Sequence, residues 1–385
     1  MSLIYSKNFF KINSCMYCWV FSRANRQMKM RIKCFSSMNK NRSTNPYLNR
    51  MYSSNDDKSS ESFQFFDLVN KDRLILFGFG ILVAGSLIGY ERNINIRNKH
   101  KELKKKLHSS VLNAQNAVKE GNYEAAVAHY RESRSIVNDV AMTSTEVQKK
   151  VLLNIVEQLG HLAYALNNWS EAEMFLKETE KIMLDIGVEK NSDAYIEVML
   201  RLAKIDVINN RGKEAMDRFK FCIENLERKI SVQDVYSEPD SPAYERITLY
   251  GMVLTEYGTY AKGAGLLDES ERAFSKALNI CRNILGPTHE QTSVLANDLA
   301  TVYDEKGRYN KAIRLAEKAI RIATETAPEN LATYKYNLGH ILMHQGDLVR
   351  ARNALRESLK LAEEHQDDET RKLAESSIMK LDISQ

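Results

Sequence analysis

The sequence predicts an all-α protein: a superhelical solenoid of repeated helix pairs, preceded by a cleavable leader and one transmembrane helix. Three observations predict this fold class. The first 55 residues contain Lys and Arg but no Asp or Glu, an uncharged apolar run follows at residues 74–90, and one helical phrase then recurs in about six copies. No alternation of polar and apolar residues predicts a strand.

The predicted organisation follows these features along the chain. It comprises a transit peptide at residues 1–52, a polar linker at 53–72, a transmembrane helix at 73–91, a basic juxtamembrane segment at 92–108, helix pairs at 109–366 with an insertion loop at 231–243, and a capping helix at 367–385.

The N-terminal segment has the composition of a mitochondrial transit peptide. Ten basic residues precede Asp56, the first acidic residue. A positive segment is drawn inward by the inner-membrane potential, by about 2.3 kcal/mol per charge per 100 mV. Arg50, Tyr52 and Ser53 resemble the cleavage site used by the mitochondrial processing machinery. We therefore expect the mature chain to begin near Ser53, with a disordered basic tail as the alternative interpretation.

The net charge of +5 does not indicate a nucleic-acid partner, because it is unevenly distributed. Ten of the 55 basic residues lie in the leader, which leaves 45 basic residues against 50 acidic residues in the rest of the chain. A body with net negative charge does not attract a phosphate backbone.

Residues 74–90 predict a helix in contact with the lipid bilayer. The 17 residues carry no charge, and at 1.5 Å per residue they cover roughly 26 Å, the short end of a bilayer core. A basic stretch from Arg92 to Lys106 follows, as expected beside anionic headgroups. A buried helix of a soluble domain is the alternative.

One phrase recurs through the rest of the chain. It combines a Leu-Gly or Leu-Ala pair, an aromatic or small residue, a Gly or Asn turn and then an alanine, and the clearest copy has Leu299, Ala300, Tyr303, Gly307 and Ala312. Small residues allow two helices to approach closely, while apolar residues at helical spacing form a buried face. One copy cannot bury both faces, so neighbouring copies must stack.

These residues resemble the tetratricopeptide repeat over roughly residues 105–366. The copies exceed the usual length of about 34 residues, and residues 285–289 are similar to the connecting loop of the kinesin-light-chain type. Residues 219–227 and 341–344 are similar to a mitochondrial branch of the family. That resemblance implies a non-catalytic inner-membrane protein that binds respiratory complex III, supports its assembly and maintenance, and helps to clear fragments of its Rieske iron–sulfur protein. A membrane-anchored adaptor or import receptor for other mitochondrial proteins is the alternative.

The resemblance also implies where a protein partner docks. In this family the first helix of each pair lines a groove, and a solvated face without a ligand is the alternative at each position. Carried over by position, the groove candidates are Tyr336, His340, Met343 and His344 in the last copy, Thr301, Asp304 and Glu305 in the fifth, Thr259 and Lys262 in the fourth, and His161 and Tyr164 in the second.

No motif predicts catalysis or a bound cofactor. The sequence lacks the GxxxxGK[ST], GxSxG and HExxH patterns. His340 and His344 have a helical spacing that can hold zinc, but no third ligand accompanies them. A hydrolase or metal enzyme has only these two histidines in its favour. We therefore expect no enzyme activity, cofactor, metal or small-molecule substrate.

Overall fold

The computed structural model describes residues 83–140, 144–231, 234, 237–239 and 241–383. The predicted transit peptide, its cleavage site at Arg50, Tyr52 and Ser53, and the linker lie outside the described residues. Of the predicted transmembrane segment, only residues 83–91 are described, as the start of a long helix. Among the helices of the described part, none combines the length and apolar character needed to cross a membrane.

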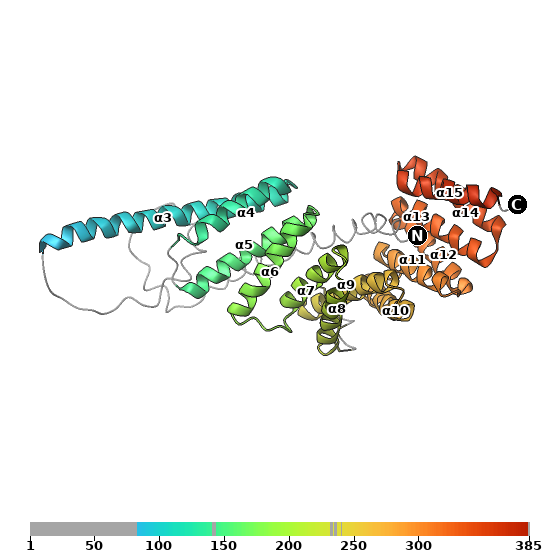
Figure 1. Ribbon diagram of the computed structural model, residues 1–385, viewed down its shortest axis with the longest axis horizontal. Helices are drawn as coiled ribbons and strands as arrows, with labels where there is room; N and C mark the ends of the chain where they lie inside the picture. Colours follow the sequence, from blue (N-terminus) through green and yellow to red (C-terminus); the bar gives the residue numbers. More distant parts are fainter. Residues whose placement is uncertain (1–82, 141–143, 232–233, 235–236, 240, 384–385) are drawn as a thin grey trace, which may run out of the picture. The chain divides into compact units, whose positions relative to one another are not determined.

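The described residues form helices and no strands, which confirms the all-α prediction (Figure 1). Six helix pairs follow one another and a single helix ends the array. The pairs are α3 (Val83–Lys119) with α4 (Tyr123–Val137), α5 (Thr145–Ala165) with α6 (Trp169–Asp185), α7 (Asp193–Ile208) with α8 (Gly212–Glu227), α9 (Pro242–Gly263) with α10 (Leu267–Ile284), α11 (Glu290–Glu305) with α12 (Tyr309–Thr326), and α13 (Leu331–Gln345) with α14 (Leu348–Glu364), followed by α15 (Asp368–Ile383).

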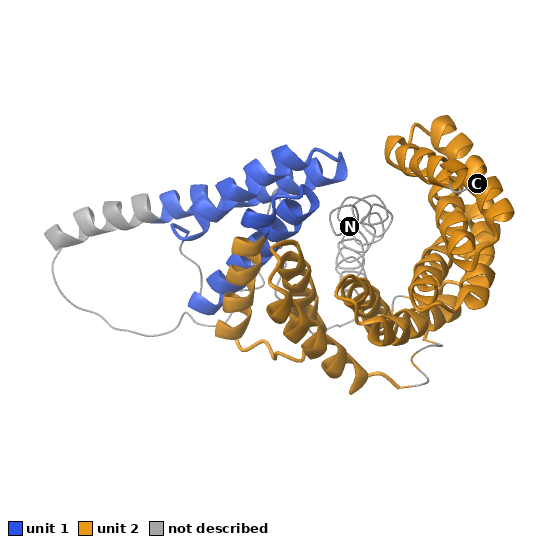
Figure 2. Ribbon diagram, turned by 45° about the vertical axis from the view of Figure 1, so that its right-hand side comes forward, with its two compact units in different colours: residues 1–172 blue, residues 173–385 orange. Residues whose placement is uncertain are grey.

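The chain divides into two compact units, residues 1–172 and 173–385 (Figure 2). In the first unit, α3 packs against α4, and α4 packs against α5. Buried Leu107 shows that packing along α3 begins before residue 109, where the sequence predicts the first pair. In the second unit each pair packs internally, and α15 packs against α14.

The array of helix pairs continues across the insertion at residues 231–243. The helices on its two sides, α8 and α9, pack together within the second unit. The ring of Phe219 on α8 lies 5.9 Å from the ring of Tyr257 and 5.6 Å from that of Tyr260 on α9. Because these rings bridge the two pairs, the third and fourth pairs form a continuous stack.

The two helices of every pair are joined by a turn with one left-handed residue. In the fifth pair this residue is Gly307, with φ of 68°. The amide of the next residue, Arg308, donates to the carbonyl of Tyr303 at 2.8 Å, which satisfies a carbonyl at the end of the helix. Glycine and asparagine tolerate positive φ best, and the equivalent residues are Gly121, Asn167, Asn210, Gly265 and Gly346.

Small residues at the crossing points let the paired helices approach closely. Gly339 on α13 is the tightest described case, because a Cβ atom there would lie 2.7 Å from Cγ of Leu355 on α14. Buried alanines surround this contact, including Ala300, Ala312 and Ala351. The core side of α13 consists of Tyr334, Leu338, Ile341 and Leu342, which are all buried.

We predict that Gly339→Ala lowers the free energy of unfolding of the second unit by about 1–3 kcal/mol, because the new methyl group overpacks fully buried Leu355. Urea unfolding followed by circular dichroism measures this change. The matched control is Gly263→Ala on α9, where no atom lies within 4 Å of the added Cβ. The control should be neutral or slightly stabilising, and an equal loss in both variants would contradict the packing explanation.

Candidate partner-binding face

The first helices of successive pairs form a continuous surface in the second unit. Helix α7 packs against α9, α11 against α13, and α13 against α15, in addition to the contacts within each pair. We name this surface the first-helix face and define it by Lys204, Glu256, Thr259, Lys262, Asp298, Thr301, Asp304, Glu305, Tyr336, His340, Met343 and His344.

Polar contacts connect each first helix to the next across this face. On α7, Lys204 Nζ lies 2.7 Å from Glu256 Oε1 on α9. One pair further, Lys262 Nζ donates to Thr301 Oγ1 on α11 at 2.6 Å and lies 3.8 Å from Glu305 Oε1. These contacts bring together groove candidates from the fourth and fifth copies and fix the spacing of the helices that carry them.

The next contact joins the fifth and last copies. His344 Nδ1 on α13 lies 2.9 Å from both carboxylate oxygens of Asp304 on α11. Five of the predicted candidates, Lys262, Thr301, Asp304, Glu305 and His344, therefore take part in contacts between neighbouring first helices. Thr259 lies on the same face, where its hydroxyl donates to the backbone carbonyl of Thr255 at 3.0 Å.

Helix α13 presents a cluster of rings on this face. The rings of Tyr336 and His340 are 4.6 Å apart, and those of His340 and His344 are 5.9 Å apart. His340 Nε2 lies 3.1 Å from the hydroxyl of Ser377 on α15. Burial and the charge of His344 lower the pKa of His340, so its imidazole is neutral at pH 7. Tyr336 and Met343 are half-buried and pack against the core.

The two histidines do not form part of a described metal site. In the part of the chain that the structure describes, no group of three His, Cys, Asp or Glu side chains could hold a metal ion. The ring nitrogens of His340 and His344 contact Ser377 and Asp304, respectively. Their role in the described structure is therefore to connect α13 to its neighbours.

Asp298 on α11 was not among the predicted candidates, although it lies at the centre of the face. Burial raises the pKa of this carboxyl to about 6; Lys262 acts to lower it, and Glu256 adds to the increase. The pKa of Glu305 is also raised, first by burial and also by Asp304. Helix α11 contains no basic residue, so this part of the face carries excess negative charge.

The distance along the sequence from Asp298 to the following turn is a signal that could have identified this residue. Asp298 precedes the left-handed Gly307 by nine residues, and Glu256 precedes Gly265 by the same interval. Arg201 and Asn337 occupy this position in the third and last pairs. Aligning the copies on the left-handed residue therefore shows that this position of the first helix is polar in the last four pairs. The residue types alone do not reveal this.

The two candidates of the second copy lie in the first unit. Tyr164 is only 7% exposed, and its ring meets that of Trp169 edge-on at a centroid distance of 5.3 Å. It belongs to the core, because the tight turn at Asn167 places Trp169 against it. Tyr164 is therefore removed from the groove candidates, whereas His161 on α5 is half-buried.

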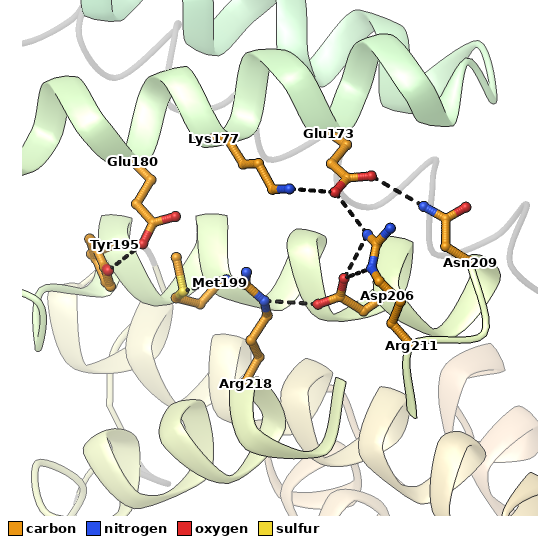
Figure 3. Close-up of polar contacts among 9 residues, drawn as sticks. All are labelled: Glu173, Lys177, Glu180, Tyr195, Met199, Asp206, Asn209, Arg211 and Arg218. Carbon is orange, nitrogen blue, oxygen red and sulfur yellow. Dashed lines mark hydrogen bonds and ion pairs between the residues drawn. The ribbon is translucent and has the colours of Figure 1, made fainter. Parts of the chain in front are cut away.

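Another group of charges, in the second unit, is satisfied internally (Figure 3). Asp206 on α7 is buried and accepts from Arg211 Nε at 2.7 Å and Arg218 Nε at 2.8 Å. Arg211 also donates to Glu173 at 2.8 Å, and Glu173 lies 2.6 Å from Lys177. Each carboxylate in this network has at least two donors, so its role is structural.

The same arrangement recurs two pairs later. Arg308, which follows the left-handed Gly307, donates to Glu271 on α10 at 3.0 Å, and Lys306 pairs with the same carboxylate. Charges around the turns thus connect successive second helices. On α11, by contrast, Asp298, Asp304 and Glu305 share only Lys262 and His344 as cationic or ring-nitrogen neighbours among the described residues of the face.

Comparison with known proteins agrees with this architecture. Residues 249–325 and 332–365 match two family models described as tetratricopeptide repeat. "Tetratricopeptide repeat protein 19, mitochondrial" from Rattus norvegicus is 32% identical over 225 residues, covering 57% of this chain and 61% of the relative. The protein of the same name from Homo sapiens is 30% identical over 241 residues, covering 62% of this chain and 63% of the relative.

A plant protein shows a more distant similarity. "Protein KINESIN LIGHT CHAIN-RELATED 2" from Arabidopsis thaliana is 22% identical over 192 residues, covering 49% of this chain and 27% of the relative. The matched part of the chain spans less than two thirds of the length of the mammalian relatives. The predicted resemblance to the tetratricopeptide-repeat family and to its mitochondrial branch is confirmed.

We predict that Asp298→Asn raises the free energy of unfolding at pH 7.5 by about 2 kcal/mol. The folded-state pKa is about 6 and exceeds that of an unfolded aspartate, so ionisation above pH 6 opposes folding. This cost disappears as the pH falls through 6 toward 4. Urea unfolding at pH 7.5 and at pH 4 measures the difference in the free energy of unfolding between the wild type and the variant.

The matched control is Asp217→Asn on the exposed side of α8. It should change the stability by less than about 0.5 kcal/mol at either pH. A stability difference for Asp298→Asn that grows as the pH falls would contradict the assignment of a desolvated carboxyl with a raised pKa.

Proposed function

We propose that this chain, which carries tetratricopeptide repeats, is a non-catalytic mitochondrial inner-membrane protein that binds subunits of respiratory complex III. The observation that carries the proposal is the similarity to relatives named as mitochondrial tetratricopeptide repeat protein 19. Through this contact the protein supports assembly and maintenance of the complex and assists in clearing fragments of the Rieske iron–sulfur protein. The acid-free leader supports import into mitochondria.

The first-helix face is the proposed docking surface for these subunits. Contacts such as Lys204 to Glu256 and His344 to Asp304 hold its side chains in place before a partner arrives. A pre-organised surface loses less conformational freedom on binding than a flexible one. The face also offers half-buried Tyr336 and Met343, whose partly apolar side chains are suited to anchor a partner.

The charge of the face indicates the chemistry of the docking segment. Asp298 and Glu305 have raised pKa values because their carboxylates are partly desolvated and lie near Glu256 and Asp304, respectively. A partner's Lys or Arg placed beside them would favour their ionised forms and form charge-assisted hydrogen bonds. We therefore propose that the complex III segment presents basic side chains to α11 and an apolar group to α13.

Residues 74–90 are the proposed tether of this docking surface to the inner membrane. Restricting a protein to the membrane that holds its partner raises the effective concentration of the binding sites for each other. Modest affinity at the first-helix face is then sufficient for association. The exposed basic residues of α3, including Lys99, Lys101 and Lys105, are suited to lie beside anionic headgroups.

We predict that Glu305→Lys combined with His344→Ala lowers the recovery of complex III subunits with the full chain at least tenfold. Both side chains are exposed on the first-helix face, and losing contacts at the centre of an interface costs about 2 kcal/mol or more. The measurement is a pulldown from mitochondria in mild detergent, with subunits quantified by mass spectrometry.

The matched control is Glu325→Lys combined with His365→Ala, which makes the same changes at exposed positions on second helices. It should retain wild-type recovery. Recovery of import-machinery subunits in place of complex III by the wild type would favour the adaptor or receptor alternative. Equal loss in both double variants would contradict the proposed face.

A further inference from the structure

Helix α12 carries a stripe of basic residues on the side that faces away from the core. Lys311, Arg314, Lys318 and Arg321 follow one another at intervals of three and four residues, which places them along one side of a helix. The opposite side of α12 holds Ala312, Ala316, Ala319 and Ala323, all fully buried. The basic side chains therefore project outward from a well-anchored helix.

Arg282 of the preceding second helix, α10, extends this stripe. Burial lowers the pKa of Lys318, and the positive charges of Arg282 and Arg321 lower it further. This electrostatic effect indicates that Arg282 lies near the stripe. We name the five side chains Arg282, Lys311, Arg314, Lys318 and Arg321 the basic ridge.

The basic ridge is not neutralised within the protein. Considering only residues that the structure describes, Arg282, Arg314, Lys318 and Arg321 form no ion pair with a carboxylate. Lys311 lies over the ring of Tyr303, with Nζ 5.5 Å from the centroid. In the same unit, other arginines such as Arg211 and Arg308 are held by glutamates. Unlike those turn residues, the ridge keeps its positive potential.

The acidic residues of α12 do not offset this potential. Glu317 is engaged by Arg350 of α14 at 3.0 Å. Glu325 lies one turn beyond Arg321, at the end of the stripe. Glu317 is therefore the only acidic residue between Lys311 and Arg321, and its carboxylate is already paired.

The surroundings of the ridge favour a lipid surface over a folded protein. Protein interfaces centre on buried aromatic or aliphatic anchors. Among the described residues, the large exposed apolar side chains closest in sequence to α10 and α12 are Leu266, before α10 begins, and Val349 on α14. The ridge extends over ten residues, about 15 Å of helix, as a row of charges on an outward-facing helix. Such a row matches a layer of anionic headgroups, where each Lys or Arg contributes about 1 kcal/mol.

We propose that the basic ridge docks the second unit onto the surface of an anionic phospholipid bilayer. This contact is separate from the proposed anchor at residues 74–90 and from the first-helix face, since it uses the second helices of the fourth and fifth pairs. It holds residues 173–385 against the membrane by charge alone, and it weakens as the salt concentration rises.

The test compares binding of the full chain to two kinds of vesicle by co-sedimentation. One kind contains phosphatidylcholine only, and in the other about a third of the lipid is phosphatidylglycerol, which supplies the negative surface. The test variant is Arg314→Gln, Lys318→Gln and Arg321→Gln. Residues 74–90, the leader and the basic residues of α3 are unchanged in every variant, so neutral vesicles report the contribution of residues 74–90. The change in the ratio of anionic to neutral binding between the wild type and the test variant then isolates the ridge.

The matched control removes three positive charges from another second helix and its C-terminal end: Lys213→Gln, Lys220→Gln and Arg228→Gln at α8. These exposed residues alternate with the acidic residues Glu214, Asp217 and Glu224. We expect the ratio of binding to anionic over neutral vesicles to be at least tenfold lower for the test variant than for the wild type. Each ridge residue should raise this ratio roughly fivefold. The control should retain its preference within about twofold.

Four outcomes would overturn the proposal: no preference of the wild type for anionic vesicles, persistence of the preference at high salt, retention of the preference by the test variant, or an equal loss in the control. A test variant that retains lipid preference but loses complex III subunits in the pulldown would identify the ridge as a protein-binding surface. Circular dichroism of all three proteins should coincide, because every substituted residue lies on the solvent-facing side of its helix.

Discussion

The left-handed residue in each interhelical turn is the constraint on which the rest of the structure depends. Its positive φ reverses the chain within three residues, and the following amide satisfies a carbonyl of the first helix, as Arg308 does for Tyr303. Because the reversal is tight, the paired helices must cross at small residues such as Gly339. Each pair then retains an unburied apolar side that only the next pair can cover. The stacking that follows aligns the first helices in the second unit and creates the first-helix face.

Stacking also explains the separation of charge between the two helices of the fifth pair. Asp298, Asp304 and Glu305 lie on α11, whereas the basic stripe from Lys311 to Arg321 lies on α12. Turn residues such as Arg308 meet a carboxylate of the preceding pair and are neutralised there. The remaining charges on α11 and α12 lie on opposite sides of the repeat, so the pair can attract a basic protein segment on one side and an anionic membrane on the other.

Helix existence, pairing and the core side of α13 could be predicted from the sequence because they depend on local periodicity and on turn residues such as Gly307 and Gly346. The contacts between repeats could not be predicted from the sequence. Lys262 meets Thr301, and Asp304 meets His344, across separations of 39 and 40 residues, and these distances depend on how successive pairs stack. Asp298 was missed because its environment, rather than its residue type, distinguishes it. Tyr164 was misplaced because its burial depends on contact with Trp169.

The most direct test of the proposed docking face is photo-crosslinking in intact mitochondria. Replacing half-buried Tyr336 with p-benzoylphenylalanine places an aromatic crosslinker on the first-helix face with little change of shape, and the same group in place of exposed Arg356 on α14 is the control. The account predicts crosslinks to complex III subunits from position 336 and not from position 356. Crosslinks to complex III from position 356 alone, or crosslinks from position 336 to other proteins only, would contradict it.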